Sequence, residues 1–399
     1  MLDQDIHAAI ASFKDDLVAI RRDIHAHPEL GFEETRTAAL VAAKLREWGV
    51  EVHEGIAKTG VVGTLRGNLP GNRSIGLRAD LDALALTEKT GLPYASTVPG
   101  KMHACGHDGH TAMLLGAARY LAANRDFAGT VHFIFQPAEE GLGGGREMVA
   151  EGLFDRFPVD AVYGMHNEAG LPVGTFALRP GPYMAAGDTW QVSFVGTGGH
   201  GGAAPHLATD PTVPAANFIL GVQTIIGRNI PASEAAVISV GHIAAGNAGA
   251  PNIIPDTVFV KGTARSYSPA IRDLIERRLT ELANAHAAAH GCRAEPVYIR
   301  RYPPLVNDPA ATATAVTAAA GVVGDANVNA DGPRHTGSED FAFMLEARPG
   351  AMIMIGNGVN DDGTAHFVHT PHYDFNDEII PVGVAYWVSL VLNGPAAAR

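Results

Sequence analysis

The sequence has no long run of apolar residues. A membrane-spanning helix needs about 18 or more consecutive apolar residues, and the 399 residues contain no such stretch. The beginning of the chain also differs from a secretion signal, because Asp3, Asp5 and Asp15 stand among apolar residues at helical spacing. We therefore expect a cytoplasmic protein with no membrane partner.

Positive charge and cysteine are both scarce. The chain carries 29 lysines and arginines against 42 aspartates and glutamates, a formal charge of −13. Proteins that bind nucleic acid draw much of their affinity from basic residues, so we expect no nucleic-acid partner. The two cysteines, Cys105 and Cys292, permit at most one disulfide. Their very different settings, and the expected cytoplasm, argue against that bond.

The chain has the size and apolar content of a globular enzyme. With 46% hydrophobic residues, it can bury a large core, and its length suits about two domains. Composition alone therefore permits an enzyme but does not identify one.

Helix and strand patterns alternate in the first half of the chain. Apolar periodicity predicts the following elements: helices near 4–27, 34–48 and 107–123, and strands at 60–66, 74–79, 130–135 and 160–165. This alternation predicts an α/β sheet with helices on both faces.

The pattern changes near residue 184 and changes back near 298. The intervening segment is expected to form strands, a helix at 210–229, further strands and a long helix at 269–290. We therefore predict a catalytic α/β domain in two parts, 1–183 and 298–399, interrupted by a smaller α+β domain at 184–297.

Polar side chains follow several predicted strands at their carboxyl ends. Asp80 follows SIGLRA, Glu139 and Glu140 follow TVHFIF, and His166 ends DAVYGM. Open α/β sheets bind ligands outside this edge. The sequence therefore predicts that these side chains gather at one site.

The segment MHACGHDGH (102–110) holds one thiol, three imidazoles and one carboxylate. Zinc and related cations prefer cysteine and histidine ligands. The simpler alternative is a polar turn that caps the helix starting near Asp108, because aspartate is a good N-cap residue. The ligand types favour a metal site.

The adjacent acids Glu139 and Glu140 suggest a division of labour. Two carboxylates beside an apolar sheet repel each other unless cations offset the charge or a pKa rises. One acid would then hold metal and the other would move protons. His166 and His369 are weaker candidates, since a lone histidine is usually an ordinary paired or exposed residue.

The motifs together resemble the metallopeptidase family of the aminoacylases, carboxypeptidase G and succinyl-diaminopimelate desuccinylase. The likeness is strongest to its subgroup of hippurate hydrolases and auxin-conjugate (indole-acetyl amino acid) hydrolases. It rests on blocks in the family's order: HAHPELGFEE, GLRADLDALAL, MHACGHDGH, FIFQPAEEG, GMHN, GGHGGAAPH, NIIPDT, GTARSY, TGSEDF and HTPHYDF.

The resemblance implies a centre of two divalent cations. Cys105 would bridge them, with Glu140 and His369 on one cation and His107 and His166 on the other. Relatives outside the subgroup have an aspartate in place of Cys105. Here a thiolate and one carboxylate offset only part of four positive charges, so zinc, manganese, cobalt and nickel all stay open as the native metal.

The resemblance also assigns roles around the metals. Glu139 matches the general base, which would take a proton from water and pass it to the leaving amine. Asp80 matches a residue that orients a metal-binding histidine. Other relatives have a His-x-Asp motif where this chain has Arg78-Ala79-Asp80, and we expect His107 to supply the missing ligand.

The inserted domain is similar to the family's lid and dimerisation domain. His200 matches a histidine that reaches across a dimer to stabilise the oxyanion, and Asn252 and Arg265 match residues that grip the substrate carboxylate. The alternative for Arg265 is an exposed strand residue in an ordinary salt bridge. A homodimer or higher homo-oligomer is implied.

These inferences predict a metal-dependent amidohydrolase that acts on N-acyl amino acids such as N-benzoyl or N-acetyl derivatives. Two alternatives stay open at this point. One is a dipeptidase or carboxypeptidase of the same family. The other is a non-catalytic protein that binds amino-acid conjugates, although such a protein has no use for a proton-transferring Glu139.

Overall fold

The computed structural model describes residues 3–359 and 364–393, and the chain divides into two compact units. Unit 1 comprises Met1–Tyr183, Val306–Pro333 and Asp340–Arg399, and unit 2 comprises Met184–Leu305 and Arg334–Glu339. Unit 2 extends past residue 297 because its last strand continues to Tyr302. The catalytic and lid roles of the two parts stay predictions.

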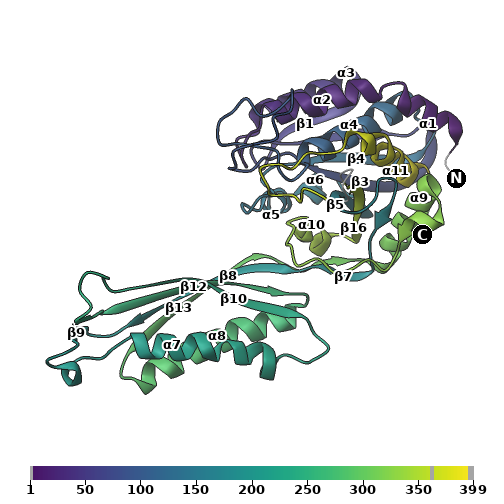
Figure 1. The fold of residues 1–399 in the computed structure, drawn as a ribbon. Coiled ribbons are helices and arrows are strands. Elements are labelled where there is room, and N and C mark those ends of the chain that lie inside the picture. The colour runs from purple at the N-terminus through teal and green to yellow at the C-terminus, as the bar shows by residue number, and fades with distance from the viewer. Residues whose placement is uncertain (1–2, 360–363, 394–399) are drawn as a thin grey trace. The chain divides into compact units, whose positions relative to one another are not determined.

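Unit 1 is built on an eight-stranded mixed sheet (Figure 1). Its strands lie in the order β1 (Glu51–Ile56), β2 (Gly60–Arg66), β4 (Ala128–Gln136), β3 (Leu69–Asp80), β5 (Ala161–Ala169), β16 (Gly350–Gly358), β6 (Phe176–Ala177) and β15 (Val328–Asn329). The central strands β4, β3, β5 and β16 run parallel, whereas β1 and β2 add antiparallel pairs at one edge. The predicted α/β class is confirmed.

Helices cover both faces of this sheet. The helices of unit 1 are α1 (Gln4–Ala11), α2 (Lys14–Ala26), α3 (Thr35–Glu47), α4 (His107–Ala123), α5 (Gly144–Ala150), α6 (Leu153–Arg156), α9 (Pro309–Val323), α10 (Ala342–Ala347) and α11 (Ile380–Asn393). Glycines on β2 show the two faces: a Cβ on Gly63 would lie 3.1 Å from Leu45 of α3, and one on Gly60 would lie 3.1 Å from Met148 of α5.

The first predicted helix, 4–27, is wrong as a single element. The chain breaks between α1 and α2 at Ser12 and Phe13. The Ser12 hydroxyl donates to the Ala9 carbonyl over 2.6 Å, and Phe13 leaves the helical region with φ of −123°. A side chain that bonds its own backbone competes with helix propagation. Apolar periodicity continues through the break and therefore hides it.

Unit 2 is a four-stranded antiparallel sheet with two helices against one face (Figure 1). The strands lie in the order β10 (Ala236–Ala245), β12 (Thr257–Ser266), β8 (Ala186–Val195) and β13 (Arg293–Tyr302), and the helices are α7 (Thr212–Gly221) and α8 (Pro269–Ala289). Its core gathers Trp190, Phe194 and Phe218.

The single helix predicted at 210–229 is also wrong. Helix α7 ends at Gly221, and a π-helical turn follows at Ile225–Asn229. The Thr224 hydroxyl donates to the Gly221 carbonyl over 2.6 Å, which again removes an acceptor from the helix ladder.

Within the described residues, no helix has both the length and the apolarity to cross a membrane.

Candidate metal centre

The predicted ligands of unit 1 gather at the carboxyl ends of the parallel strands. Helix α4 starts there, and Gly106, in the left-handed region at φ of 94°, precedes it. A Cβ on Gly106 would lie 2.1 Å from Asn167 Oδ1 and 2.6 Å from the Tyr373 hydroxyl. Only glycine fits this position, and it places Cys105 and His107 on either side of the tight turn.

The five predicted ligands form two groups that share one cysteine. The ligand atoms of Cys105, His107 and His166 lie within 4.8 Å of one another, and so do those of Cys105, Glu140 and His369. Cys105 Sγ lies 3.4 Å from His166 Nε2, and His369 Nε2 lies 3.2 Å from Glu140 Oε1. This arrangement suits two neighbouring cations with a common thiolate ligand.

Backbone contacts orient the ligand imidazoles. His107 Nδ1 donates to the Asp82 carbonyl over 2.8 Å, which leaves Nε2 buried and without a hydrogen-bond partner. His166 Nδ1 donates to the Asn167 carbonyl over 2.7 Å. The amide of His369, a residue with φ of 63°, donates to the Ala104 carbonyl over 2.7 Å. Metal-binding histidines commonly donate their second ring N–H to such a carbonyl, so His107 and His166 fit a cation, while the amide bond of His369 holds its backbone.

Protons occupy several positions that a cation would take. Bonds with Cys105 and Glu140 raise the pKa of His369 to about 10. Burial, and then the charge of Glu140, raises the pKa of the Cys105 thiol. His166 differs from these two, because burial, and then the charge of His110, lowers its pKa. Metal binding displaces protons from such ligands, and the concentration of negative charge around Cys105 favours that exchange.

Glu139 lies beside this cluster. The residue is 7% exposed, and its carboxylate comes within 4.8 Å of ligand atoms of His107 and Glu140. The Asp340 amide donates to Glu139 Oε1 over 3.3 Å. A buried carboxylate next to the ligands can exchange protons with a water or amine held there.

Asp80 contacts more than the histidine it was predicted to orient. Its Oδ1 accepts from His110 Nδ1 over 2.6 Å, and its Oδ2 lies 3.6 Å from His107 Nε2. His110 Nε2 lies 2.7 Å from Asn167 Oδ1, so this imidazole links β3 to β5 behind the ligands. Sequence reasoning missed His110, although it is the third imidazole of the 102–110 motif.

Arg78 occupies the position where the family resemblance led us to expect a lost metal-binding histidine. Its guanidinium is fully buried and donates to Asp80 Oδ2 over 2.8 Å, Gln136 Oε1 over 2.9 Å and Asp340 Oδ1 over 3.1 Å. Arginine has no acceptor and stays protonated, so it cannot bind a cation here. It ties the ends of β3 and β4 to residue 340 instead.

Unit 2 brings together His200 and Asn252, two of its three predicted site residues. His200 lies on the short strand β9 (Gly199–His200), which pairs with β11 (Ile253–Ile254). The Gly201 amide donates to the Asn252 carbonyl over 2.8 Å. Both side chains are exposed.

Arg265 lies at the opposite end of the unit 2 sheet. It pairs with Gly187 on β8, whereas the β9 and β11 ladder follows the other end of that strand, at Val195. Eight residues of extended strand span about 26 Å. One copy of unit 2 therefore does not bring Arg265 together with His200 and Asn252.

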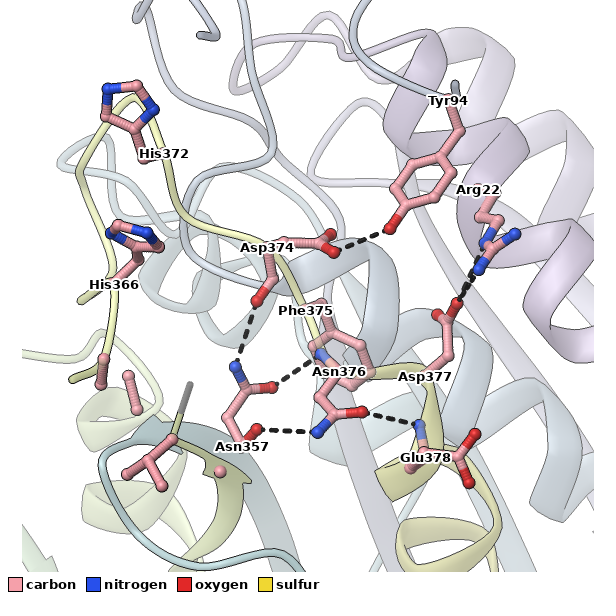
Figure 2. Close-up of a pocket in the computed structure, with 14 residues that line it drawn as sticks. Arg22, Tyr94, Asn357, His366, His372, Asp374, Phe375, Asn376, Asp377 and Glu378 are labelled. Atoms are coloured by element: carbon pink, nitrogen blue, oxygen red, sulfur yellow. Dashed lines mark hydrogen bonds and ion pairs between the residues drawn. The ribbon is translucent and has the colours of Figure 1, made fainter. Parts of the chain in front are cut away.

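A separate pocket of about 400 Å³ in unit 1 lies beside the loop that carries His366, His369 and His372 (Figure 2). His366 and His372 line it, but none of the five predicted ligands does. Asn357 donates to the Asp374 carbonyl and accepts from the Asn376 amide, over 3.1 and 2.9 Å. These bonds join the segments on either side of His369.

Known proteins match the chain over nearly its whole length. The model of peptidase family M20/M25/M40 matches residues 76–393. A hippurate hydrolase from Campylobacter jejuni is 40% identical over 388 residues, which cover 96% of this chain and 98% of the relative. An N-acetyl-L-cysteine deacetylase from Bacillus subtilis is 39% identical over 377 residues, which cover 93% and 86%.

The fold also matches a solved structure over nearly the whole length of both chains. The YxeP protein of Bacillus subtilis, described as a dinuclear metal-binding peptidase of the M20 family, superposes with a TM-score of 0.83 at 33% identity. The match covers 96% of this chain and 98% of that one. The resemblance inferred from the motifs is thereby confirmed, and the chain belongs to peptidase family M20/M25/M40.

Proposed function

We propose that this protein hydrolyses the amide bond of N-acyl amino acids, such as N-benzoylglycine or N-acetyl amino acids. The observation that carries the proposal is the pair of ligand groups sharing Cys105, with the Glu139 carboxylate beside them. The hippurate hydrolase and N-acetylcysteine deacetylase names of the relatives point to the same substrate class.

Two divalent cations fit the proposed centre. Cys105, Glu140 and His369 would hold one, and Cys105, His107 and His166 the other. When bound, the cations supply Lewis-acid chemistry that lowers the pKa of water and polarises a carbonyl oxygen. Thiolate and imidazole donors favour zinc, cobalt or nickel, and carboxylate also accepts manganese, so we infer a metal from this group.

Glu139 carries the proton in this proposal. Its carboxylate takes a proton from water as the water oxygen bonds to the acyl carbon, and it gives that proton to the amide nitrogen as the carbon–nitrogen bond breaks. The products are a carboxylic acid and a free amino acid. Asp80 supports this step indirectly, because it fixes His110 and lies beside His107.

His200 has the tautomer that an oxyanion donor needs. Its Nδ1 accepts from the amides of Gly202 and Ala203, over 3.2 and 3.1 Å. The ring proton therefore sits on Nε2, where it can be donated to a developing oxyanion. Asn252 and Arg265 are assigned to the substrate carboxylate, which a guanidinium recognises with two parallel bonds.

We infer a homodimer from the separation of these residues. His200 and Asn252 lie about 26 Å or more from Arg265 along the strands of unit 2. A second copy supplies the missing group if His200 and Asn252 serve the metal centre of the partner subunit. Exposed Leu220 on α7 and Ile243 on β10 give unit 2 apolar surface for such contact.

The direct test combines metal removal with a change of the base. Chelated protein is expected to lose hydrolysis of N-benzoylglycine, and added manganese, zinc or cobalt to restore it. Glu139→Gln should keep its metal while turnover falls steeply. Full turnover by metal-free protein, or by Glu139→Gln, would refute the mechanism. A non-catalytic binder would release no amino acid in any of these assays.

A second candidate is peptidase action on free dipeptides, favoured by the peptidase description of the Bacillus subtilis structure. A panel of dipeptides and N-acyl amino acids on the same reconstituted protein separates the two. Higher kcat/KM for dipeptides would replace the amidohydrolase assignment.

A further inference from the structure

We propose that Asp82 is a positioning residue that holds the turn carrying Glu139 and Glu140 by its backbone, with Glu34 as a second support. The inference rests on the proposed function, since it takes Glu139 as the proton carrier. Asp82 was not among the residues singled out in the sequence, although it follows Asp80 by two positions.

Asp82 captures two successive amides of this turn. Its Oδ1 accepts from the Glu139 amide over 3.0 Å, and its Oδ2 accepts from the Glu140 amide over 2.9 Å. The Asp82 side chain is fully buried. Hydrogen bonds from amides to a carboxylate are stronger than those between neutral groups. The two bonds therefore fix the backbone of both Glu139 and Glu140.

The same residue also orients a predicted metal ligand. The Asp82 carbonyl accepts from His107 Nδ1 over 2.8 Å, and Asp82 Oδ1 lies 3.3 Å from that nitrogen. Asp82 therefore joins His107, a ligand of one group, to Glu140, a ligand of the other, and to Glu139 between them.

The turn needs such support because its backbone is strained. Ala138 adopts φ of 55°, a region that residues other than glycine rarely occupy. Its amide donates to Glu34 Oε1 over 2.8 Å, and the second oxygen of Glu34 accepts from the Thr59 hydroxyl over 2.6 Å. Glu34 is fully buried. Two buried carboxylates thus bind three consecutive amides.

The bonding pattern requires a carboxylate rather than an amide at position 82. Each oxygen of Asp82 receives one N–H group. An asparagine offers one oxygen and one NH₂ group, so one of the two amides would face a donor. Asp82→Asn keeps the size and shape of the side chain but removes one of the two hydrogen bonds to the turn.

Glu29→Gln provides a matched control. Glu29 also captures two successive amides with its two oxygens, those of Arg36 and Thr37, over 2.9 and 2.8 Å. Those amides begin helix α3, and neither belongs to the 138–140 turn. The control therefore removes the same kind of interaction from amides that are not part of the proposed catalytic turn.

The experiment compares Asp82→Asn, Glu29→Gln and Glu139→Gln, each loaded with manganese. We expect Asp82→Asn to lose about 10–100-fold in kcat on N-benzoylglycine, with KM changed by less than about threefold. Hydrogen exchange of metal-free protein, followed by mass spectrometry, should be at least about tenfold faster in the peptide around 137–141 and unchanged in α4 and α11. Glu29→Gln should match the parent on all of these measures.

The outcomes separate this inference from the proposed function. If Glu139→Gln is inactive while Asp82→Asn behaves like Glu29→Gln, the positioning role of Asp82 is wrong and the mechanism stands. If Glu139→Gln is active, the mechanism itself is wrong. A loss of kcat without faster exchange at 137–141 also overturns the inference. Should Asp82→Asn fail to fold, Glu34→Gln decides by the same two measurements.

Discussion

The predicted site residues are held very differently in the two units. In unit 1, His107, His166 and His369 are each fixed by a bond to or from the backbone. In unit 2, His200 and Asn252 are exposed on a two-residue ladder at one end of the sheet. A metal centre needs fixed geometry within one chain, whereas substrate-gripping groups can be delivered by an assembly.

The largest effect is expected where the two ligand groups of unit 1 meet. Cys105→Ala should lower kcat/KM by about three orders of magnitude or more and reduce metal content, because both groups lose a ligand. Metal analysis and hydrolysis of N-benzoylglycine check this. Cys292→Ala, the other cysteine and half-exposed in unit 2, is the control. Equal losses of activity and metal in both variants would show that Cys105 has no special role in the metal centre of unit 1.

A subunit-mixing experiment tests whether unit 2 serves the partner subunit. His200→Ala alone should lose about 100–1000-fold in kcat, as expected for an oxyanion donor, with full metal content. Mixing it with inactive Cys105→Ala should restore about a quarter of parental activity, because half of randomly formed dimers contain one complete site. No recovery after verified subunit exchange would show that His200 acts within its own chain, or not at all.

A buried ion network in unit 1 predicts a pH dependence of stability. Burial opposes protonation of His25, but the Asp108 and Glu88 carboxylates outweigh it and raise the pKa to about 9 from 6.5. The protonated form is favoured by folding, so its contribution is complete below pH 6.5 and is lost as pH rises through about 9. The loss is expected to reach about 3 kcal/mol.

Denaturant unfolding of the parent and His25→Gln between pH 6 and 10 measures this contribution. The difference in the free energy of unfolding between the two proteins should shrink as pH rises. A constant difference across the range would mean that the proton on His25 does not stabilise the folded state.

The smallest effect is expected at the pocket in Figure 2. The Tyr94 hydroxyl donates to Asp374 Oδ2 over 2.7 Å, while its ring lies under the guanidinium groups of Arg21 and Arg22. Tyr94→Phe keeps the ring contacts and removes one bond, so the free energy of unfolding should fall by about 1 kcal/mol. Thermal unfolding checks this, and kcat should be unchanged. A large loss of kcat would place this pocket in the catalytic machinery.

Local patterns predicted much of the fold because they repeat within single elements. Helix α4 begins and ends at 107 and 123, as expected, and β2 covers 60–66. Breaks caused by one side chain, such as Ser12 or Thr224, leave the periodicity intact and were missed.

The predicted ligand set came from motifs and the family resemblance, but the contacts around it could not be predicted. Arg78 and Asp340 are 262 positions apart, and no spacing rule links them. Asp82 resembles any polar residue after a strand until its two amide partners are known. His369 was separable from His366 and His372 only by the family resemblance, since all three share one loop.

The interruption of unit 1 by unit 2 sets an order of events during synthesis. Strand β5 pairs with β16, which the ribosome makes only after the whole of unit 2, and His369 follows later still. The predicted ligands Cys105, His107 and His166 all precede unit 2 in the sequence, whereas His369 of the second group follows it. The second group of predicted ligands can therefore close only after unit 2 has been synthesised, and chains halted within unit 2 would hold at most one of the two groups.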